Sequence, residues 1–149
     1  LLSAKEIINE VKEDLTENGL IFSDDVKLGC MIEVPSAALT CDLLAKECDF
    51  LSLGTNDLVQ YSLAVDRGNE SLDYLYNPLD PSIIRLLKLV VSEANNHGIP
   101  VSACGEIAAD PLFVPLFLGL NYKLYSSSGI KLSCVSSSHC AICSLSTLI

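Results

Sequence analysis

The residues of this sequence most suited to chemistry are two carboxylates, an amide, a guanidinium and a thiol. They are Glu33, Asp57, Asn56, Arg67 and Cys104. The most informative of them lie in the stretch Gly54-Thr-Asn-Asp57, which follows a short apolar run from Phe50 to Leu53. Such a run predicts a buried strand that the glycine ends, and the exits of strands are where α/β proteins keep their functional residues.

Thr55 or Asn56 is predicted to cap a helix that continues from Leu58 to Ala64 and leaves free backbone N–H groups at its start. A helix start of this kind attracts an anion, most often phosphate. Asp57 would repel a bare phosphate unless a divalent cation bridged the two groups. The residues therefore suggest a metal and phosphate site. A capped turn with a solvated aspartate is the alternative interpretation.

The pattern of apolar residues predicts helices that alternate with parallel strands. The expected helices span residues 1–18, 36–47, 58–64, 80–97 and 111–120, and the expected strands span residues 26–32, 50–53, 100–103 and 124–126. The first helix is predicted to be amphipathic, with charges on one face and Ala4, Ile8, Val11 and Leu15 on the other. The helix from Asp80 has a predicted buried stripe of Ile83, Leu87, Val90 and Ala94.

The five chemical residues all fall at or just beyond the ends of successive expected strands. In a parallel sheet these ends lie on one face, so the pattern predicts that two carboxylates, an amide, an arginine and a thiol converge. Their convergence indicates a single site. No glycine-rich dinucleotide loop, Walker loop, GxSxG or HExxH motif is present.

Composition narrows the class of protein. Half of the 149 residues are apolar, which suffices for one domain core, and the net charge of −10 argues against an extended nucleic-acid surface. The sequence shows no secretion signal and begins at Leu1, so we expect a cytoplasmic chain and a fragment. The apolar stretch 111–120 is too short for membrane insertion.

The seven cysteines do not form the pattern of a disulfide scaffold. Cys41 and Cys48 share a helical stripe with Ala37 and Leu44, which favours small core residues. A zinc or redox site near the C terminus is an alternative that lacks a second pair of ligands at the usual spacing. Its ligands would be Cys134, His139, Cys140 and Cys143.

Four stretches together resemble enzyme I of the bacterial phosphoenolpyruvate-dependent sugar phosphotransferase system. They are Cys30-Met-Ile-Glu-Val-Pro35, Leu53-Gly-Thr-Asn-Asp-Leu58, Ala64-Val-Asp-Arg-Gly-Asn69 and Ala103-Cys-Gly-Glu-Ile-Ala108. The resemblance runs from about residue 1 to residue 130. Pyruvate phosphate dikinase and phosphoenolpyruvate synthase share the second and fourth elements, but the third followed by the fourth is more similar to enzyme I.

The resemblance implies an α/β fold of the parallel-strand (β/α)8 TIM-barrel type. Residues 1–130 would be roughly the later half of the barrel, and residues 131–149 a divergent tail rich in serine and cysteine. The implied reaction transfers a phosphoryl group from phosphoenolpyruvate (PEP) to a histidine on a separate N-terminal domain and then to the carrier protein HPr, with release of pyruvate. The implied assembly is a homodimer. Neither His97 nor His139 matches the motif of the phosphorylated histidine.

Motif match also implies a role for each chemical residue. Glu33 and Asp57 would bind Mg²⁺, while Asn56, Arg67 and the backbone of Asp57 would hold the phosphate of PEP. Cys104 would act as an acid that protonates the methylene carbon of the enolate. Each residue also has an ordinary alternative: a solvated charge at Glu33, a surface ion pair of Arg67 with Asp66 or Glu70, and a small buried side chain at Cys104.

The missing earlier strands supply further arginines in the family, so the chain is expected to be inactive alone. Two other interpretations remain open. One is a PEP-binding domain of the pyruvate phosphate dikinase or phosphoenolpyruvate synthase type. The other is a non-catalytic relic that only dimerises with intact enzyme I.

Overall fold

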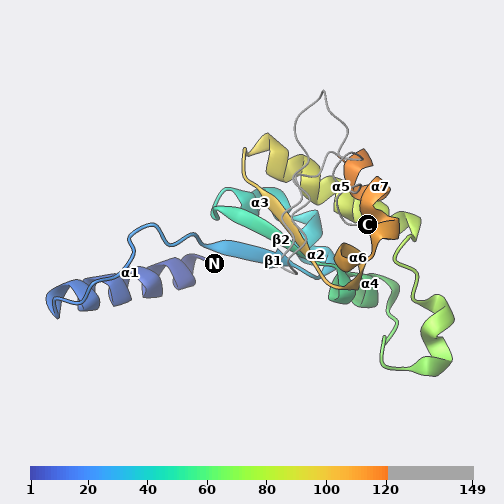
Figure 1. Ribbon diagram of the computed structural model, residues 1–149, viewed down its shortest axis with the longest axis horizontal. Helices are drawn as coiled ribbons and strands as arrows, with labels where there is room; N and C mark the ends of the chain where they lie inside the picture. Colours follow the sequence, from blue (N-terminus) through green and yellow to red (C-terminus); the bar gives the residue numbers. More distant parts are fainter. Residues whose placement is uncertain (121–149) are drawn as a thin grey trace, which may run out of the picture.

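The computed structural model describes residues 1–120, which form three parallel strands with helices between them. The strands are β1 (Gly29–Ile32), β2 (Phe50–Gly54) and β3 (Val101–Cys104), in the spatial order β1-β2-β3 (Figure 1). In the register of these pairs, Ile32 lies beside Leu53 and Gly54 lies beside Cys104. The predicted alternation of helices with parallel strands is confirmed. Residues 1–120 do not themselves form a closed barrel.

Helices connect and flank the strands. They are α1 (Leu2–Glu17), α2 (Pro35–Leu39), α3 (Cys41–Ala45), α4 (Thr55–Leu63), α5 (Pro81–Asn96), α6 (Glu106–Ala109) and α7 (Val114–Gly119), with 3-10 turns η1 (Glu70–Leu75) and η2 (Pro111–Phe113). The predicted strand 124–126, the tail from residue 131 and the four alternative zinc ligands lie outside the described residues.

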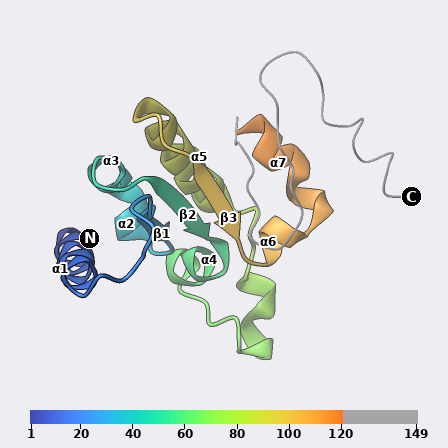
Figure 2. The same ribbon diagram turned by 60° about the vertical axis from the view of Figure 1, so that its left-hand side comes forward.

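One face of the sheet carries the hydrophobic core. Because side chains alternate along a strand, this face receives Ile32 from β1, Leu51 and Leu53 from β2, and Val101 and Ala103 from β3. Helices α2 and α3 both pack against α5 (Figure 2). The stripe predicted for α5 is confirmed, since Ile83, Leu87, Val90 and Ala94 are each at most 1% exposed.

The opposite face of the sheet carries smaller and more polar residues and is more open. Met31 on β1 is 48% exposed, and Ser52, Ser102 and Cys104 are half-buried. The alternation that buries the apolar residues places these four on the other side of the strands. Side chains at the strand ends on this face are therefore reachable from solvent.

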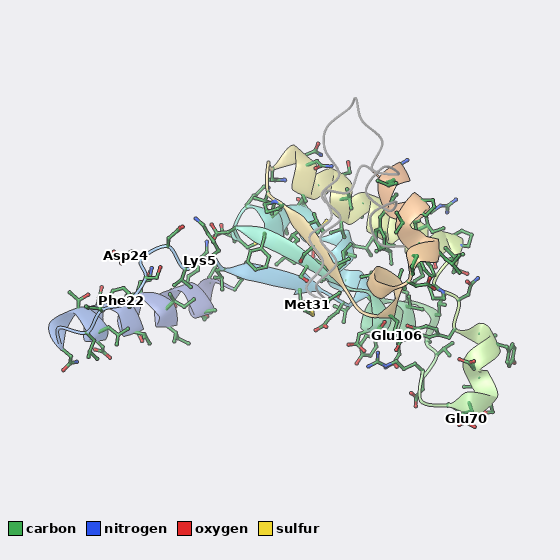
Figure 3. All side chains as sticks on the ribbon, viewed as in Figure 1. Lys5, Phe22, Asp24, Met31, Glu70 and Glu106 are labelled. Carbon is green, nitrogen blue, oxygen red and sulfur yellow. The ribbon has the colours of Figure 1, made fainter. Side chains whose placement is uncertain are left out.

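Helix α1 has nearly its predicted length. Its apolar face is not buried, and Val11 on that face is 50% exposed. The helix projects away from the sheet (Figures 1 and 3). Lys5 near its start forms a 2.9 Å ion pair with Glu47. Periodicity identifies an apolar face without showing what covers it.

Three predictions about the bounds of helices and strands need correction. The helix predicted over residues 36–47 is divided into α2 and α3 at Thr40, whose hydroxyl donates to the Ser36 carbonyl at 2.9 Å and competes with helical hydrogen bonding. The strand predicted from residue 26 begins only at Gly29. The stretch 111–120 forms η2 and α7 rather than one helix, and buries Phe117. The core placement predicted for Cys41 and Cys48 is confirmed.

Helix α5 begins at Pro81 as predicted, and Asp80 caps it. The Asp80 carboxylate accepts hydrogen bonds from the Ser82 hydroxyl and from the Ser82 N–H, the latter at 2.8 Å. These bonds, chiefly that from the hydroxyl, hold the pKa of Asp80 below its ordinary value. The ionised form of the carboxylate is therefore the one that stabilises the helix start.

Acid is expected to weaken this cap. Because the pKa of Asp80 is lowered by folding from an ordinary 3.8, the stabilisation is complete above that pH and is lost as the pH falls through the folded-state pKa. Asp80→Asn keeps a capping oxygen that does not titrate. The thermal midpoint, followed by circular dichroism, should therefore fall less in Asp80→Asn than in the unchanged chain between about pH 6 and pH 3. Equal pH dependence in both chains would contradict this prediction.

Candidate functional site

The ends of the three strands place Glu33, Gly54 and Cys104 in one row. Gly54 at the end of β2 pairs with Cys104 at the end of β3. Ile32 at the end of β1 pairs with Leu53, so Glu33 reaches the level of Gly54. Two of the predicted chemical residues therefore flank a position that has no side chain.

The carboxylate of Glu33 lies against the backbone of Gly54. A Cβ atom at Gly54 would lie 2.8 Å from the Cβ and 3.1 Å from Oε2 of Glu33. Gly54 is also the residue before α4, whose first turn contains Asp57. The absence of a side chain at Gly54 thus lets one predicted metal ligand approach the helix start that carries the other.

Helix α4 begins at Thr55, and the prediction that Thr55 or Asn56 caps it is wrong. Gly54 is the N-cap, and no side chain of residues 1–120 caps the helix. Thr55 and Asn56 instead bind the turn that follows β3. The buried Thr55 hydroxyl, 1% exposed, donates to the Cys104 carbonyl at 2.7 Å, and Asn56 Oδ1 accepts from the Glu106 N–H at 3.1 Å. We call these two hydrogen bonds the β2–β3 turn contacts.

Gly105 fits between the two partners of the β2–β3 turn contacts. Its φ of +102° belongs to the region that favours glycine. A Cβ at Gly105 would lie 2.6 Å from Thr55 Oγ1 and 2.8 Å from Asn56 Oδ1. Figure 3 shows Glu106 where α6 and α4 come together, and these helices are in contact. The Gly54-Thr-Asn and Cys104-Gly-Glu segments therefore form one packed unit.

The β2–β3 turn contacts also orient the amide of Asn56. Its oxygen accepts from a backbone N–H, and this assigns the other arm of the amide to the NH2 group. That arm can donate to an anion. The first N–H groups of α4, which no side chain caps, are donors beside it.

Arg67 lies on the loop after α4. Its backbone N–H donates to Gln60 Oε1 at 3.2 Å, which ties the loop to the helix. Its Nη2 lies 4.0 Å from Asp57 Oδ1, rather than pairing with Asp66 or Glu70, and the two side chains are 46% and 39% exposed. So long and exposed an ion pair contributes little, so the guanidinium can turn toward a ligand at low cost.

The thiol of Cys104 is half-buried on the open face of the sheet. Its Sγ donates to the Leu53 carbonyl at 3.3 Å and lies 3.9 Å from the Ser52 hydroxyl. The structure thus places four of the predicted residues around the end of β2: Glu33, Asn56, Asp57 and Cys104. It attaches Arg67 to that group through Asp57.

Sequence reasoning missed Tyr76. Its hydroxyl donates to the Asn56 carbonyl at 3.2 Å and holds the loop after α4 against the helix start. Burial raises the pKa of Tyr76, the nearby carboxylates of Glu106 and Asp57 raise it further, and Arg67 opposes them. Tyr76 therefore remains a donor at neutral pH. No local pattern marks this contact, because it spans 20 residues.

The described residues offer two carboxylates for a metal ion, rather than a full set of protein ligands. Within residues 1–120 there is no group of three or more His, Cys, Asp or Glu side chains that could hold a metal ion. Mg²⁺ retains several waters and often takes only one or two carboxylates, with the substrate supplying other oxygens. The side chains predicted as ligands, Glu33 and Asp57, are carboxylates and so are of the type that this ion takes.

Two features of the described residues lie apart from this group. A hollow of about 540 Å³ opens at the other end of the strands and is lined by Lys27, Asp49, Phe50, Pro100, Val101 and Ser102. None of the five predicted site residues lines it. Among residues 1–120, no helix combines the length and the apolar character that crossing a membrane requires.

Comparison with known proteins identifies the family of this chain. Residues 1–140 match the family described as PEP-utilising enzyme, PEP-binding domain. The chain is 46% identical over 129 residues to the phosphoenolpyruvate-protein phosphotransferases of Bacillus subtilis, Priestia megaterium and Staphylococcus aureus, which covers 87% of this chain. It spans only 22–23% of the length of those relatives. The match over nearly the whole chain shows that it belongs to the PEP-utilising enzyme family, in the PEP-binding domain.

Proposed function

We propose that this chain supplies part of the PEP site of a phosphoenolpyruvate-protein phosphotransferase. The observation that carries the proposal is the row of strand ends at which Glu33, the uncapped start of α4 and Cys104 meet. An anion-binding helix start, two carboxylates and a thiol suit PEP, which has a phosphate, a carboxylate and a carbon that must gain a proton. The relatives named above carry that activity in their names.

The phosphate of PEP binds at the start of α4. The backbone N–H groups of its first turn and the Asn56 NH2 group donate to phosphate oxygens, and the helix dipole favours their negative charge. Arg67 leaves its long contact with Asp57 and donates its planar fork to the phosphate. Positioning and charge neutralisation of this kind are most of what phosphoryl transfer requires.

Glu33 and Asp57 would hold Mg²⁺ together with oxygens of PEP and water. The ion, when bound, neutralises charge on the carboxylate and phosphate of the substrate. In this structure the Asp57 carboxylate has Arg67 as its partner, and on substrate binding the metal ion would take the place of Arg67. Glu33 lies against Gly54, the residue before α4, because Gly54 has no side chain.

Cys104 protonates the enolate that remains after the phosphoryl group has left, and the product is pyruvate. Its half-buried thiol lies on the open face of the sheet, at the level of Gly54. Because the Thr55 hydroxyl holds the Cys104 carbonyl, the backbone of the proton donor is fixed to the helix that binds the phosphate. The acid and the anion site thus keep one relative position.

We also propose the larger context of this site. The three parallel strands would be part of the later half of a (β/α)8 barrel, which explains why the second face of the sheet is open. The phosphoryl group would pass to a histidine elsewhere in the same enzyme and then to HPr. The enzyme would be a cytoplasmic homodimer, and this chain alone would not turn over PEP.

Magnesium-dependent binding of PEP tests the proposal. Calorimetric titration of the chain, with its helicity checked by circular dichroism, should give a binding heat that requires Mg²⁺. Asp57→Asn should weaken this binding by at least about tenfold, because a metal ligand and its charge are lost. Asp42→Asn is a matched control, since Asp42 also lies in the first turn of a helix, α3. It should bind as the unchanged chain does.

Two results would count against the proposal. A folded chain without magnesium-dependent binding would instead favour a relic that only dimerises with an intact enzyme. Equal weakening by Asp57→Asn and Asp42→Asn would show that net charge, rather than a site at α4, governs the binding.

A further inference from the structure

Ser52 lies close to the sulfur of Cys104 on the open face of the sheet. Its hydroxyl is 3.9 Å from Sγ, and it comes from the middle of β2 whereas Cys104 ends the neighbouring strand β3. Ser52 is half-buried between the buried residues Leu51 and Leu53. A hydroxyl in this position faces the proposed proton donor rather than the core.

Either atom could donate in this contact, and the other bond of the sulfur assigns the hydrogen to Ser52. A thiol has one proton, and that of Cys104 is directed to the Leu53 carbonyl at 3.3 Å. The carbonyl oxygen can only accept, so the thiol is the donor in that bond. The sulfur can therefore act only as an acceptor toward Ser52, whose hydroxyl donates to it.

We propose that Ser52 is a positioning residue that stabilises the sulfur of Cys104 while its proton is away. This inference rests on the proposed function. In the step concerned, the π electrons of the enolate form a C–H bond with the thiol proton, and the S–H electrons stay on sulfur. The products are pyruvate and a thiolate, which then recovers a proton from water.

When Cys104 loses its proton, one of the two contacts of its sulfur becomes unfavourable. The Leu53 carbonyl, which accepted from the thiol, then directs its lone pairs at an anion. Ser52 keeps its hydrogen bond in both states, and a bond to a charged acceptor is stronger than one to a neutral acceptor. Ser52 therefore favours the thiolate and lowers the cost of proton donation.

Ser102 offers a matched control on the same face. It is the register partner of Ser52 on the adjacent strand β3, and it is also half-buried. Its hydroxyl donates to the Leu51 carbonyl at 3.5 Å instead of contacting the sulfur. Removing either hydroxyl makes the same chemical change in the same row of the sheet.

The test is the pH dependence of Cys104 alkylation by iodoacetamide in the full chain, with the Cys104 peptide quantified by mass spectrometry. Only the thiolate reacts, so the midpoint of the profile reports how strongly the surroundings favour that form. Ser52→Ala should move the midpoint upward by about half a pH unit, which is about threefold slower reaction below it. Ser52→Thr, which keeps a hydroxyl, should restore the original midpoint.

Within residues 1–120, the charged groups at this end of the sheet are Glu33 after β1, Asp57 on α4, Arg67 on the following loop and Glu106 on α6. They are the same in all variants, so their effects cancel in the comparison. The Cys48 peptide of each sample serves as an internal reference, because Cys48 packs against the core on another part of the chain.

An upward shift confined to Ser52→Ala supports the inference. An unchanged midpoint in Ser52→Ala would overturn it, because Ser52 would then have no effect on the thiolate. An equal shift in Ser102→Ala would also overturn it, because the shift would then follow from the loss of any hydroxyl on this face. The assay contains no PEP. A failure of PEP binding would therefore count against the proposed function and leave the result on Ser52 standing.

Discussion

Cys104→Ala is expected to reduce pyruvate formation by about 100- to 10,000-fold, the usual contribution of a positioned general acid. Binding of PEP should remain within about twofold, because the phosphate donors on α4 are unchanged. The measurement requires an active enzyme. A suitable one is a chimera in which the matching segment of this chain replaces that of the Bacillus subtilis relative, with pyruvate followed by a coupled dehydrogenase assay.

Cys48→Ala is the control for this experiment. Cys48 packs against the core and is not at a strand end of the candidate site, so its loss should leave pyruvate formation nearly unchanged. Undiminished pyruvate formation in Cys104→Ala would remove Cys104 from the proposed mechanism. A large rise in the KM for PEP with unchanged kcat would instead assign the thiol to substrate binding.

Gly105→Ala is expected to destabilise the fold by about 3 kcal/mol, because two costs add. The φ of +102° disfavours any side chain, and the new Cβ would lie 2.6 Å from the buried Thr55 hydroxyl and 2.8 Å from Asn56 Oδ1. Both β2–β3 turn contacts must then shift. Urea unfolding followed by circular dichroism gives the free energy of unfolding.

Gly98→Ala separates the two costs. Gly98 also has a positive φ, +69°, but no atom of the part of the chain that the structure describes lies within 4 Å of a Cβ built there. It should therefore lose only the backbone term, about 1 kcal/mol. If Gly105→Ala and Gly98→Ala lower the free energy of unfolding equally, the close approach of Thr55 and Asn56 to Gly105 does not contribute to stability. The close packing of the Gly54-Thr-Asn and Cys104-Gly-Glu segments would then be contradicted.

The order and type of the elements could be predicted because they follow from local patterns. Helix α5 shows this best: a capping aspartate, a proline at its start and apolar residues at helical spacing agree with one another, and all four predicted core residues are buried. Helix α1 shows the limit. Its apolar spacing predicts a helix correctly, but burial depends on a partner surface that lies elsewhere in the chain or in another chain.

The candidate site could be predicted as a set of residues, since parallel strands bring their ends to one edge. The bonds within it could not be predicted. Thr55 and Asn56 have side chains typical of N-caps, and the local rule assigned them to α4. In the structure, these side chains bind the turn after β3 instead: Thr55 donates to the Cys104 carbonyl, and Asn56 accepts from the Glu106 N–H. Ser52 was open to prediction, as a polar residue alternating with buried leucines on β2.

The β2–β3 turn contacts also set when the site can form during folding. They join residues that are 49 and 50 positions apart, across α4, the loop with η1, α5 and most of β3. Closing so long a segment is entropically costly, so contacts of this range form late, after the local helices. We therefore expect the amide hydrogen of Glu106, which is bonded to Asn56, to exchange with solvent when these contacts open, and so to report on a late step of assembly.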